Sequence, residues 1–226
     1  MSRSYLRSVF FLFIASALLV GCASSRNQMP DEWDGLVRQP NTRVRGLFIK
    51  PDAELAGYRN IKLDPVEVSF ARNWDPNRGG RSAVGRLDAS DVQAIQTGVA
   101  DMVNELFTAE LGRGGYQIVQ EAGAETLRVS AAVVDLYVAA PDTMTPGRTR
   151  TYTANSGRMT LVLEVRDSVT GELLARAVDA QSGRGSGTWT VTNRVTNTAD
   201  ARRAINIWAV ALRSALDELN GKVPAR

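Results

Sequence analysis

The spacing of apolar residues changes along this chain, and the order of those changes is the feature that most limits its fold. Apolar residues alternate with polar ones in 58–70 and recur every three or four positions in 88–111. They alternate again in four stretches within 116–180 and return to the wider spacing in 198–220. Alternation is typical of strands, and the wider spacing is typical of helices.

The resulting order is β-α-β-β-β-β-α, without the regular exchange of strand and helix that builds a parallel doubly wound sheet. We therefore predict an α+β fold: an antiparallel or mixed sheet of about five strands, with two long helices packed on one face. Pro65 lies inside the first strand region and cannot donate a ladder hydrogen bond, so that strand should lie at an edge or carry a bulge.

Short polar motifs mark where several of these elements begin and end. Asp88, with Asp91 three residues later, forms a carboxylate version of the capping box before the first helix. Asn197, with Asp200 in the following turn, predicts the start of the second helix. The sequence Ser-Val-Thr-Gly at 168–171 predicts a tight turn that joins two strands into a hairpin.

The N-terminus has the features of an export signal. Arg3 and Arg7 precede an apolar run over 9–20, which is too short to be a stable membrane-spanning helix and is typical of a secretory signal peptide. Its end, Leu19-Val20-Gly21-Cys22, resembles the lipobox of bacterial lipoproteins.

That resemblance implies cleavage between Gly21 and Cys22 and attachment of lipid to the Cys22 thiol and the new amine. Three acyl chains would anchor the protein stably. We expect residues 1–21 to be a signal peptide, 22–45 a lipidated flexible tether, and 46–226 a single periplasmic domain. Ala23 follows the cysteine where aspartate would retain an enteric lipoprotein in the inner membrane, which implies the outer membrane, facing the periplasm.

Composition excludes several classes of site. The chain has no histidine and one cysteine, which excludes histidine-dependent triads, histidine-ligated or cysteine-cluster metal sites and internal disulfides. We expect no cofactor and no metal. Removal of Arg3 and Arg7 leaves basic and acidic side chains nearly balanced, so we also expect no binding to nucleic acid.

Carboxylates alone could still support hydrolysis, as paired acids do in glycosidases. Six lie on or beside the expected strands, and Asp135 has apolar neighbours on both sides. The linear spacing places no two of them in one cleft, so a small carboxylate-dependent periplasmic hydrolase is the alternative function. The six are Asp64, Glu67, Asp135, Glu164, Asp167 and Asp179.

Arginine and aromatic residues gather in the expected loops before and after the last strands. Such pairs are typical of interface anchors. The alternative is a solvated loop surface in a chain where arginine is common throughout. The candidate partner contacts are Arg148, Arg150, Tyr152, Arg184, Trp189 and Arg194.

The lipobox, the segment YRNIKLDPVEVSF and the step Gly115-Tyr116-Gln117-Ile118-Val119 together resemble a family of bacterial lipoproteins of unknown function, domain of unknown function 3313. The element order also resembles the anticodon-binding-like module of periplasmic lipoproteins that activate cell-wall synthases or assemble secretion pores. These resemblances bear on location and fold, because a shared fold does not carry a function. Our leading hypothesis for the function is a non-enzymatic binding or assembly module with a protein or cell-wall partner. Homo-oligomerisation through the edge strand stays open.

Overall fold

The computed structural model describes residues 29–222, except 41, 54, 78–85, 139–150, 154–156, 184–189 and 193. One compact unit spans Asp31–Arg226. Its elements, in chain order, are β1 (Glu32–Trp33), β2 (Leu36–Gln39), β3 (Gly46–Ile49), β4 (Asn60–Leu63), β5 (Glu67–Phe70), α1 (Ala89–Arg113), β6 (Gln117–Ile118), β7 (Thr126–Val138), β8 (Thr151–Thr153), β9 (Gly157–Asp167), β10 (Leu173–Ser182), β11 (Thr190–Thr192) and α2 (Arg194–Leu219).

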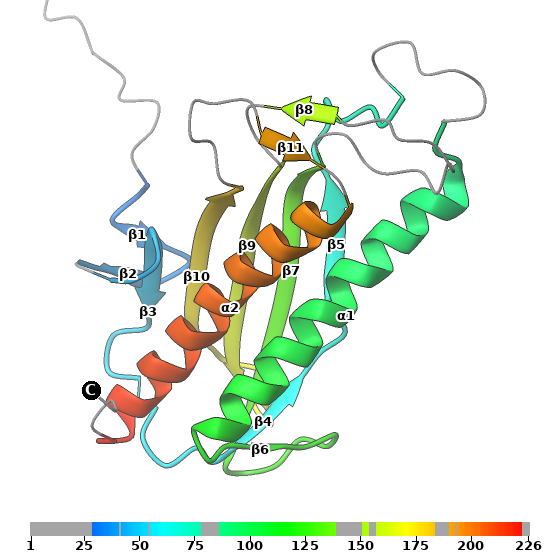
Figure 1. Ribbon diagram of the computed structural model, residues 1–226. Helices are drawn as coiled ribbons and strands as arrows, with labels where there is room; N and C mark the ends of the chain where they lie inside the picture. Colours follow the sequence, from blue (N-terminus) through cyan, green and yellow to red (C-terminus); the bar gives the residue numbers. More distant parts are fainter. Residues whose placement is uncertain are drawn as a thin grey trace, which may run out of the picture. The chain divides into compact units, whose positions relative to one another are not determined.

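Nine of these strands form one mixed sheet, in the order β1-β2-β3-β10-β9-β7-β4-β6, with β5 also paired to β7. The pairs that join β1, β2, β3, β10, β9 and β7 are antiparallel, whereas β4 pairs with both β7 and β6 in parallel and β5 pairs with β7 in parallel. Helices α1 and α2 lie side by side on one face of the sheet (Figure 1). The predicted α+β class is confirmed, and the predicted strand number is too low.

The core lies between the two helices and the sheet, as the alternation in the strands predicts. Side chains from every second position of β7 and β9 point into it. Val103, Ile205 and Trp208 from the helices are each at most 1% exposed. The strand residues that meet them are Leu127, Val129, Ala131, Val133, Met159, Leu161, Leu163 and Val165.

Pro65 divides the first predicted strand into two. β4 pairs with the first part of β7, from Thr126 to Val129, and β5 pairs with the part that begins at Ala132. Both pieces therefore follow the same border of β7, and the chain leaves the ladder only around the residue that lacks an N–H. The second piece, β5, pairs with β7 and has a register shift between Val68 and Phe70, as the expected bulge predicts, whereas β4 lies between β7 and β6 and is not an edge strand.

Strand β7 carries a bulge that corrects the alternation predicted for its second half. Asp135 has a φ of 52°, and the register with β9 shifts between Val134 and Tyr137. The side chain of Asp135 is exposed while Leu136 is buried. A bulge places two residues opposite one, which turns Leu136 toward the core and Asp135 toward solvent.

Helix α1 begins as its capping motif predicts. Oδ1 of Asp88 accepts hydrogen bonds from the backbone N–H groups of Ser90 (2.8 Å) and Asp91 (3.0 Å). Oδ2 of Asp91 accepts one from the N–H of Asp88 at 3.0 Å. The two carboxylates therefore satisfy three backbone donors that the first turn cannot pair internally.

Helix α2 starts earlier than predicted. Asn197 is not its N-cap, because the helix already begins at Arg194, directly after β11. β11 is paired with β8, and this pairing determines where the helix can begin. A capping motif involves only neighbouring residues, so it cannot predict the pairing. At the other end, Gly221 has a φ of 68°, and the N–H of Lys222 donates to the carbonyl of Asp217 at 2.8 Å. This turn closes the helix as expected.

The predicted tether over residues 22–45 is wrong in its second half. Asp34 and Gly35, with φ values of 53° and 77°, form a two-residue turn that joins β1 to β2. Leu36 is 1% exposed, and β3 pairs with β10. These short strands lack a long alternating pattern, and they join the sheet through the pairing of β3 with β10, which is distant in sequence. The compact unit therefore begins at Asp31.

None of the helices in the described part of the chain is long and apolar enough to cross a membrane.

Candidate functional site

Most of the predicted partner contacts lie outside the described residues, namely Arg148, Arg150, Arg184 and Trp189. Tyr152 lies in β8, and Arg194 is the first residue of α2. β8 and β11 pair antiparallel, with Tyr152 opposite Val191. The structure therefore joins the two segments that carry the predicted contacts. The sequence predicted loops here, whereas β8, β11 and the start of α2 are regular elements. The contact role of these residues stays a prediction.

The predicted lipid site, Cys22 with Gly21 before it, also lies outside the described residues. The described part of the chain contains no group of three or more histidine, cysteine, aspartate or glutamate side chains arranged to hold a metal ion.

Two of the six strand carboxylates stabilise turns and strand ends. Oδ2 of Asp64 accepts hydrogen bonds from Nε of Arg128 at 2.7 Å and from the Ser130 hydroxyl. Oδ1 of Asp167 accepts from the N–H groups of Val169 (2.9 Å) and Thr170 (2.7 Å), which closes the β9–β10 turn.

Glu164 and Asp179 lie in the sheet and hold neighbouring elements together. Glu164 pairs with Arg166 at 2.8 Å and with Arg176 at 2.6 Å. Burial raises the pKa of Glu164, but hydrogen bonds from both guanidinium groups bring it below its ordinary value. Asp179 is 2% exposed and accepts from the indole N–H of Trp208 at 2.8 Å. The other two, Glu67 and Asp135, are exposed.

A buried ionic network joins the C-terminal parts of α1 and α2, and no local sequence pattern predicted it. Arg213 of α2 donates to Glu110 of α1 at 2.7 Å and to Asp217 at 2.6 Å. Both carboxylates are at most 5% exposed. Burial raises the pKa of Glu110, whereas hydrogen bonds from Arg213 and Arg113 lower it, and the net pKa is below the usual value. The network fixes the two helix ends relative to each other.

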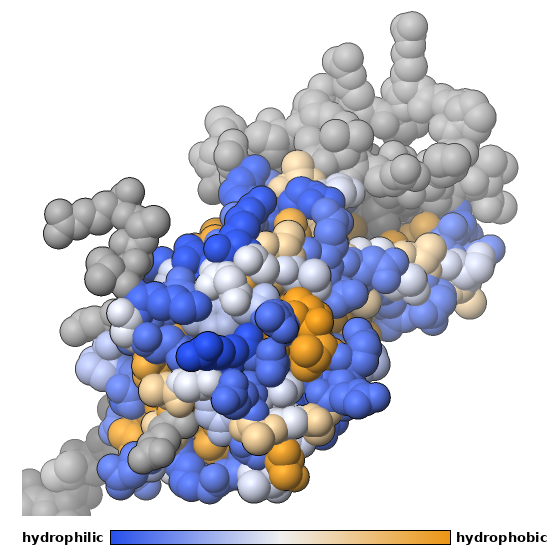
Figure 2. Space-filling view, turned by 90° about the horizontal axis from the view of Figure 1, so that it is seen from below, coloured by the Kyte–Doolittle hydropathy of each residue, from blue (hydrophilic) through white to orange (hydrophobic). Residues whose placement is uncertain are grey.

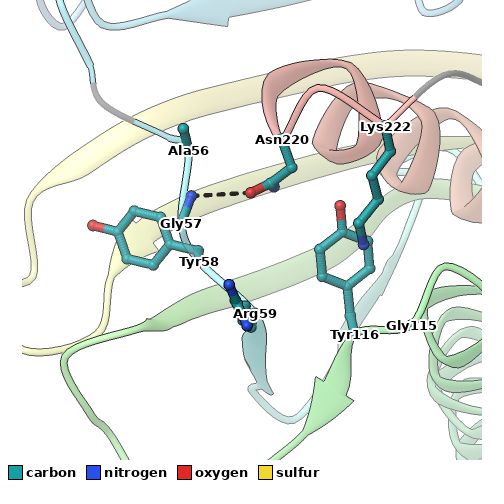
Figure 3. Close-up of a pocket in the computed structure, with 8 residues that line it drawn as sticks. All are labelled: Ala56, Gly57, Tyr58, Arg59, Gly115, Tyr116, Asn220 and Lys222. Carbon is teal, nitrogen blue, oxygen red and sulfur yellow. Dashed lines mark hydrogen bonds between the residues drawn. The ribbon is translucent and has the colours of Figure 1, made fainter.

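A pocket of about 430 Å³ lies beside this network. Three segments line it: residues 56–59 before β4, Gly115 and Tyr116 after α1, and Asn220 and Lys222 after α2. Figure 3 shows Tyr58 and Tyr116 on opposite sides of the pocket, with Arg59 between them in this view. The N–H of Gly57 donates to Oδ1 of Asn220 at 3.0 Å and links two of the segments.

The two tyrosines of the pocket are fixed by carboxylates behind them. The hydroxyl of Tyr58 donates to Asp167 at 2.8 Å, and that of Tyr116 donates to Asp217 at 3.1 Å. Burial, and then the hydrogen bond to the carboxylate, raises the pKa of each phenol to about 12. Both side chains are therefore neutral at physiological pH.

Lys222 covers one wall of the pocket. Its Nζ lies 4.1 Å from the centre of the Tyr116 ring and donates to the carbonyl of Gly114 at 2.8 Å. That carbonyl lies at the C-terminal end of α1, where a cation is favoured. Seen from this end of the domain, the surface is mainly hydrophilic, with small hydrophobic areas among the polar side chains (Figure 2).

Sequence reasoning missed this pocket because its residues come from three distant segments. A weak signal is present in Gly57-Tyr58 and Gly115-Tyr116, where a glycine precedes each aromatic residue. Both glycines have positive φ values, 98° and 80°, which glycine adopts readily.

Solved structures of low sequence identity resemble the chain. A protein from Xanthomonas campestris, described as a member of DUF330, is 13% identical, with a TM-score of 0.45 over 82% of this chain and 98% of that one. The dodecameric protein PelC from Paraburkholderia phytofirmans is 11% identical, with a TM-score of 0.38 over 73% and 96%. A minor lipoprotein from Acinetobacter baumannii is 14% identical, with a TM-score of 0.35 over 72% and 93%.

No curated protein matches the chain. A family model does match it, over residues 26–212, which include both helices up to Leu212 and every strand of the sheet. The extent of that match confirms the resemblance inferred from the sequence. The chain therefore belongs to the family described as protein of unknown function, DUF3313.

Proposed function

We propose that this protein is a lipid-anchored envelope protein whose folded unit is a binding or assembly module. The anchor is supported by Arg3 and Arg7, the apolar run over 9–20 and the lipobox that ends at Cys22. An exported protein with a single cysteine has no internal partner for that thiol, and lipidation gives the thiol a role.

Ala23 supports an outer-membrane location, facing the periplasm, because aspartate is the retaining residue at that position in the sorting rule that it resembles. The first strand begins at Glu32, ten residues after Cys22. An extended chain spans at most about 3.5 Å per residue, so this linker reaches at most about 35 Å. The domain would therefore act close to the membrane that holds the anchor.

A binding role is supported best by what the strand carboxylates do. The hydrolase alternative needs two carboxylates that share a cleft and keep free oxygen atoms. Asp64, Glu164, Asp167 and Asp179 instead accept hydrogen bonds from neighbouring strands, turns and α2. Their arrangement fits a structural role, and it favours the binding module over the hydrolase.

Labelling and fractionation test the anchor. With radioactive palmitate, the wild-type protein should be labelled and should sediment with the outer membrane, whereas Cys22→Ser should lose the label and stay unprocessed or soluble. Ala23→Asp should move the protein to the inner membrane in a host with the enteric rule. Unchanged labelling and membrane retention of Cys22→Ser would refute the anchor.

A second assay tests the binding role. The wild-type protein and the variants Asp135→Asn and Glu164→Gln are incubated with peptidoglycan and glycans. We expect no turnover by any of them, together with capture of a specific partner by crosslinking in cells. Hydrolysis by the wild type that either variant abolishes would establish the enzyme instead.

A further inference from the structure

We propose that the pocket formed by residues 56–59, Gly115, Tyr116, Asn220 and Lys222 binds the free carboxylate of a small ligand, with Arg59 as its anchor. This inference gives the proposed binding module a ligand class. It does not depend on the lipid anchor.

Arg59 is the cation in this pocket that is available to a ligand. Its side chain is exposed, and it makes no hydrogen bond or ion pair with any residue that the structure describes. Its backbone is fixed, because its N–H donates to the carbonyl of Glu125 at 3.2 Å and its carbonyl accepts from the N–H of Gln117 at 3.0 Å. The backbone therefore holds the start of the side chain at the pocket, and its planar guanidinium can take a carboxylate in a bidentate manner.

The charges behind the pocket do not compete for Arg59. Asp217 already accepts from Arg213 at 2.6 Å and from the Tyr116 hydroxyl at 3.1 Å. Asp167 accepts from the Tyr58 hydroxyl and from the backbone of its own turn. Lys222 meets the carbonyl of Gly114 and lies 4.0 Å from Asp217. Of the two cations that line the pocket, Arg59 is the one whose donors are unused, and its single positive charge balances one monovalent carboxylate.

The walls of the pocket are more polar than apolar, which suits a small ligand with polar groups next to its carboxylate. Tyr58 and Tyr116 contribute aromatic side chains to the lining, and Lys222 lies over the ring of Tyr116. Both phenols are neutral, so they do not repel an anion. A Cβ placed on Gly57 or Gly115 would meet no atom within 4 Å, which shows that the backbone borders open space at both positions. The volume of about 430 Å³ lies within the range of small-molecule sites.

Nuclear magnetic resonance titration of the full-length protein in detergent tests this assignment. The probes are N-acetyl-alanyl-alanine with a free C-terminus, the same dipeptide as its C-terminal amide, and inorganic phosphate. We expect the free acid to shift the amide signals of Gly57 and Gly115, and the amide and phosphate to bind more weakly. Arg59→Gln should weaken binding of the free acid about tenfold or more, the effect of losing a charge-assisted hydrogen bond.

Arg72→Gln is the matched control, because Arg72 is also exposed and without a side-chain partner among the described residues, and it lies after β5, whereas Arg59 lies before β4. It should leave binding within about twofold. Arg59→Lys keeps the charge without the fork and should bind with intermediate affinity. The assignment is overturned if the acid and the amide bind equally, if Arg59→Gln and Arg72→Gln behave alike, or if no probe shifts the pocket signals. None of these results would change the outcome of the palmitate labelling and fractionation that test the lipid anchor.

Discussion

The indole Nε1 of Trp208 lies 2.8 Å from Oδ2 of Asp179 and donates a hydrogen bond to it. Trp208 is 1% exposed and Asp179 is 2% exposed, so the bond is inside the core, between α2 and β10. The second carboxylate oxygen, Oδ1, accepts from the backbone N–H of Arg45 at 3.0 Å. The buried carboxylate of Asp179 therefore connects both the last helix and the N-terminal segment to β10 by hydrogen bonds.

Trp208→Ala should lower the free energy of unfolding by about 3–5 kcal/mol, because it removes a large buried side chain and leaves a cavity. Trp208→Phe should cost less, since it keeps much of the apolar volume and loses only the hydrogen bond to Asp179. Urea denaturation measures both changes. The matched control is Ile207→Ala, which lies next in the same helix and is 40% exposed.

Trp189→Ala tests a prediction made from the sequence, namely that Trp189 contacts a partner. It should change the free energy of unfolding by less than about 0.5 kcal/mol while weakening partner capture. If it unfolds as readily as Trp208→Ala, Trp189 belongs to the core instead.

Arg213→Ala should destabilise the protein by about 3 kcal/mol, because Glu110 and Asp217 would be left buried without their shared cation. Arg202→Ala removes the other arginine of α2 that pairs with α1, but both it and Glu105 are exposed, so the cost should be small. Thermal or urea unfolding compares the two. Equal losses would show that the buried network contributes nothing beyond an ordinary surface pair.

Gly114→Ala should destabilise the end of α1. A Cβ at this position would lie 2.9 Å from Cγ of Arg213 and 3.0 Å from the ring of Tyr116, so the side chains of the ionic network would have to move. Gly98→Ala is the control inside the same helix, where a Cβ would meet no atom within 4 Å. It should stabilise the protein by about 0.5–1 kcal/mol, because alanine is the better helix former. Stabilisation by both substitutions would contradict this account.

High pH should weaken the fold through Tyr58 and Tyr116. Both phenols have an ordinary pKa of 10.0, which folding raises to about 12. The folded state therefore favours the protonated form, so this contribution is complete below pH 10.0 and is lost as pH rises toward about 12. Urea denaturation at a series of pH values measures the loss. Tyr116→Phe should make the dependence shallower, and an unchanged slope would show that Tyr116 does not carry it.

Removal of the N-terminal strands should destabilise the sheet. A chain that begins at residue 46 lacks β1, β2, the buried Leu36 and the contact between Arg43 and Ser214 at 2.9 Å. A chain that begins at residue 31 keeps all of these and should be as stable as the mature protein. Equal stability of the two chains would instead support the sequence-based prediction that residues 22–45 are a tether.

Local pattern predicted the two long helices and the three longest strands, β7, β9 and β10, because each contains enough turns or alternating positions for its period to be visible. Asp88 and Asp91 predicted the start of α1 correctly, since a capping box involves only neighbouring residues. Asn197 did not predict the start of α2, because the chain enters that helix from β11, which is paired with a strand about forty residues earlier in the sequence.

The sequence by itself determined the fold class, the irregularity around Pro65 and the β9–β10 hairpin, because each is encoded by residues close together in the chain. The lipid anchor at Cys22 stays a prediction. Only the tertiary structure decided that residues 32–49 join the sheet, that Asp135 leaves β7 in a bulge, and that Arg59, Tyr116 and Lys222 meet around one pocket. The physical reason is that periodicity reports which face of an element is apolar, whereas pairing partners and buried charges depend on which elements meet. Arg213 shows the difference: its sequence position places it on a helix, and only the packing of α2 on α1 places it between Glu110 and Asp217.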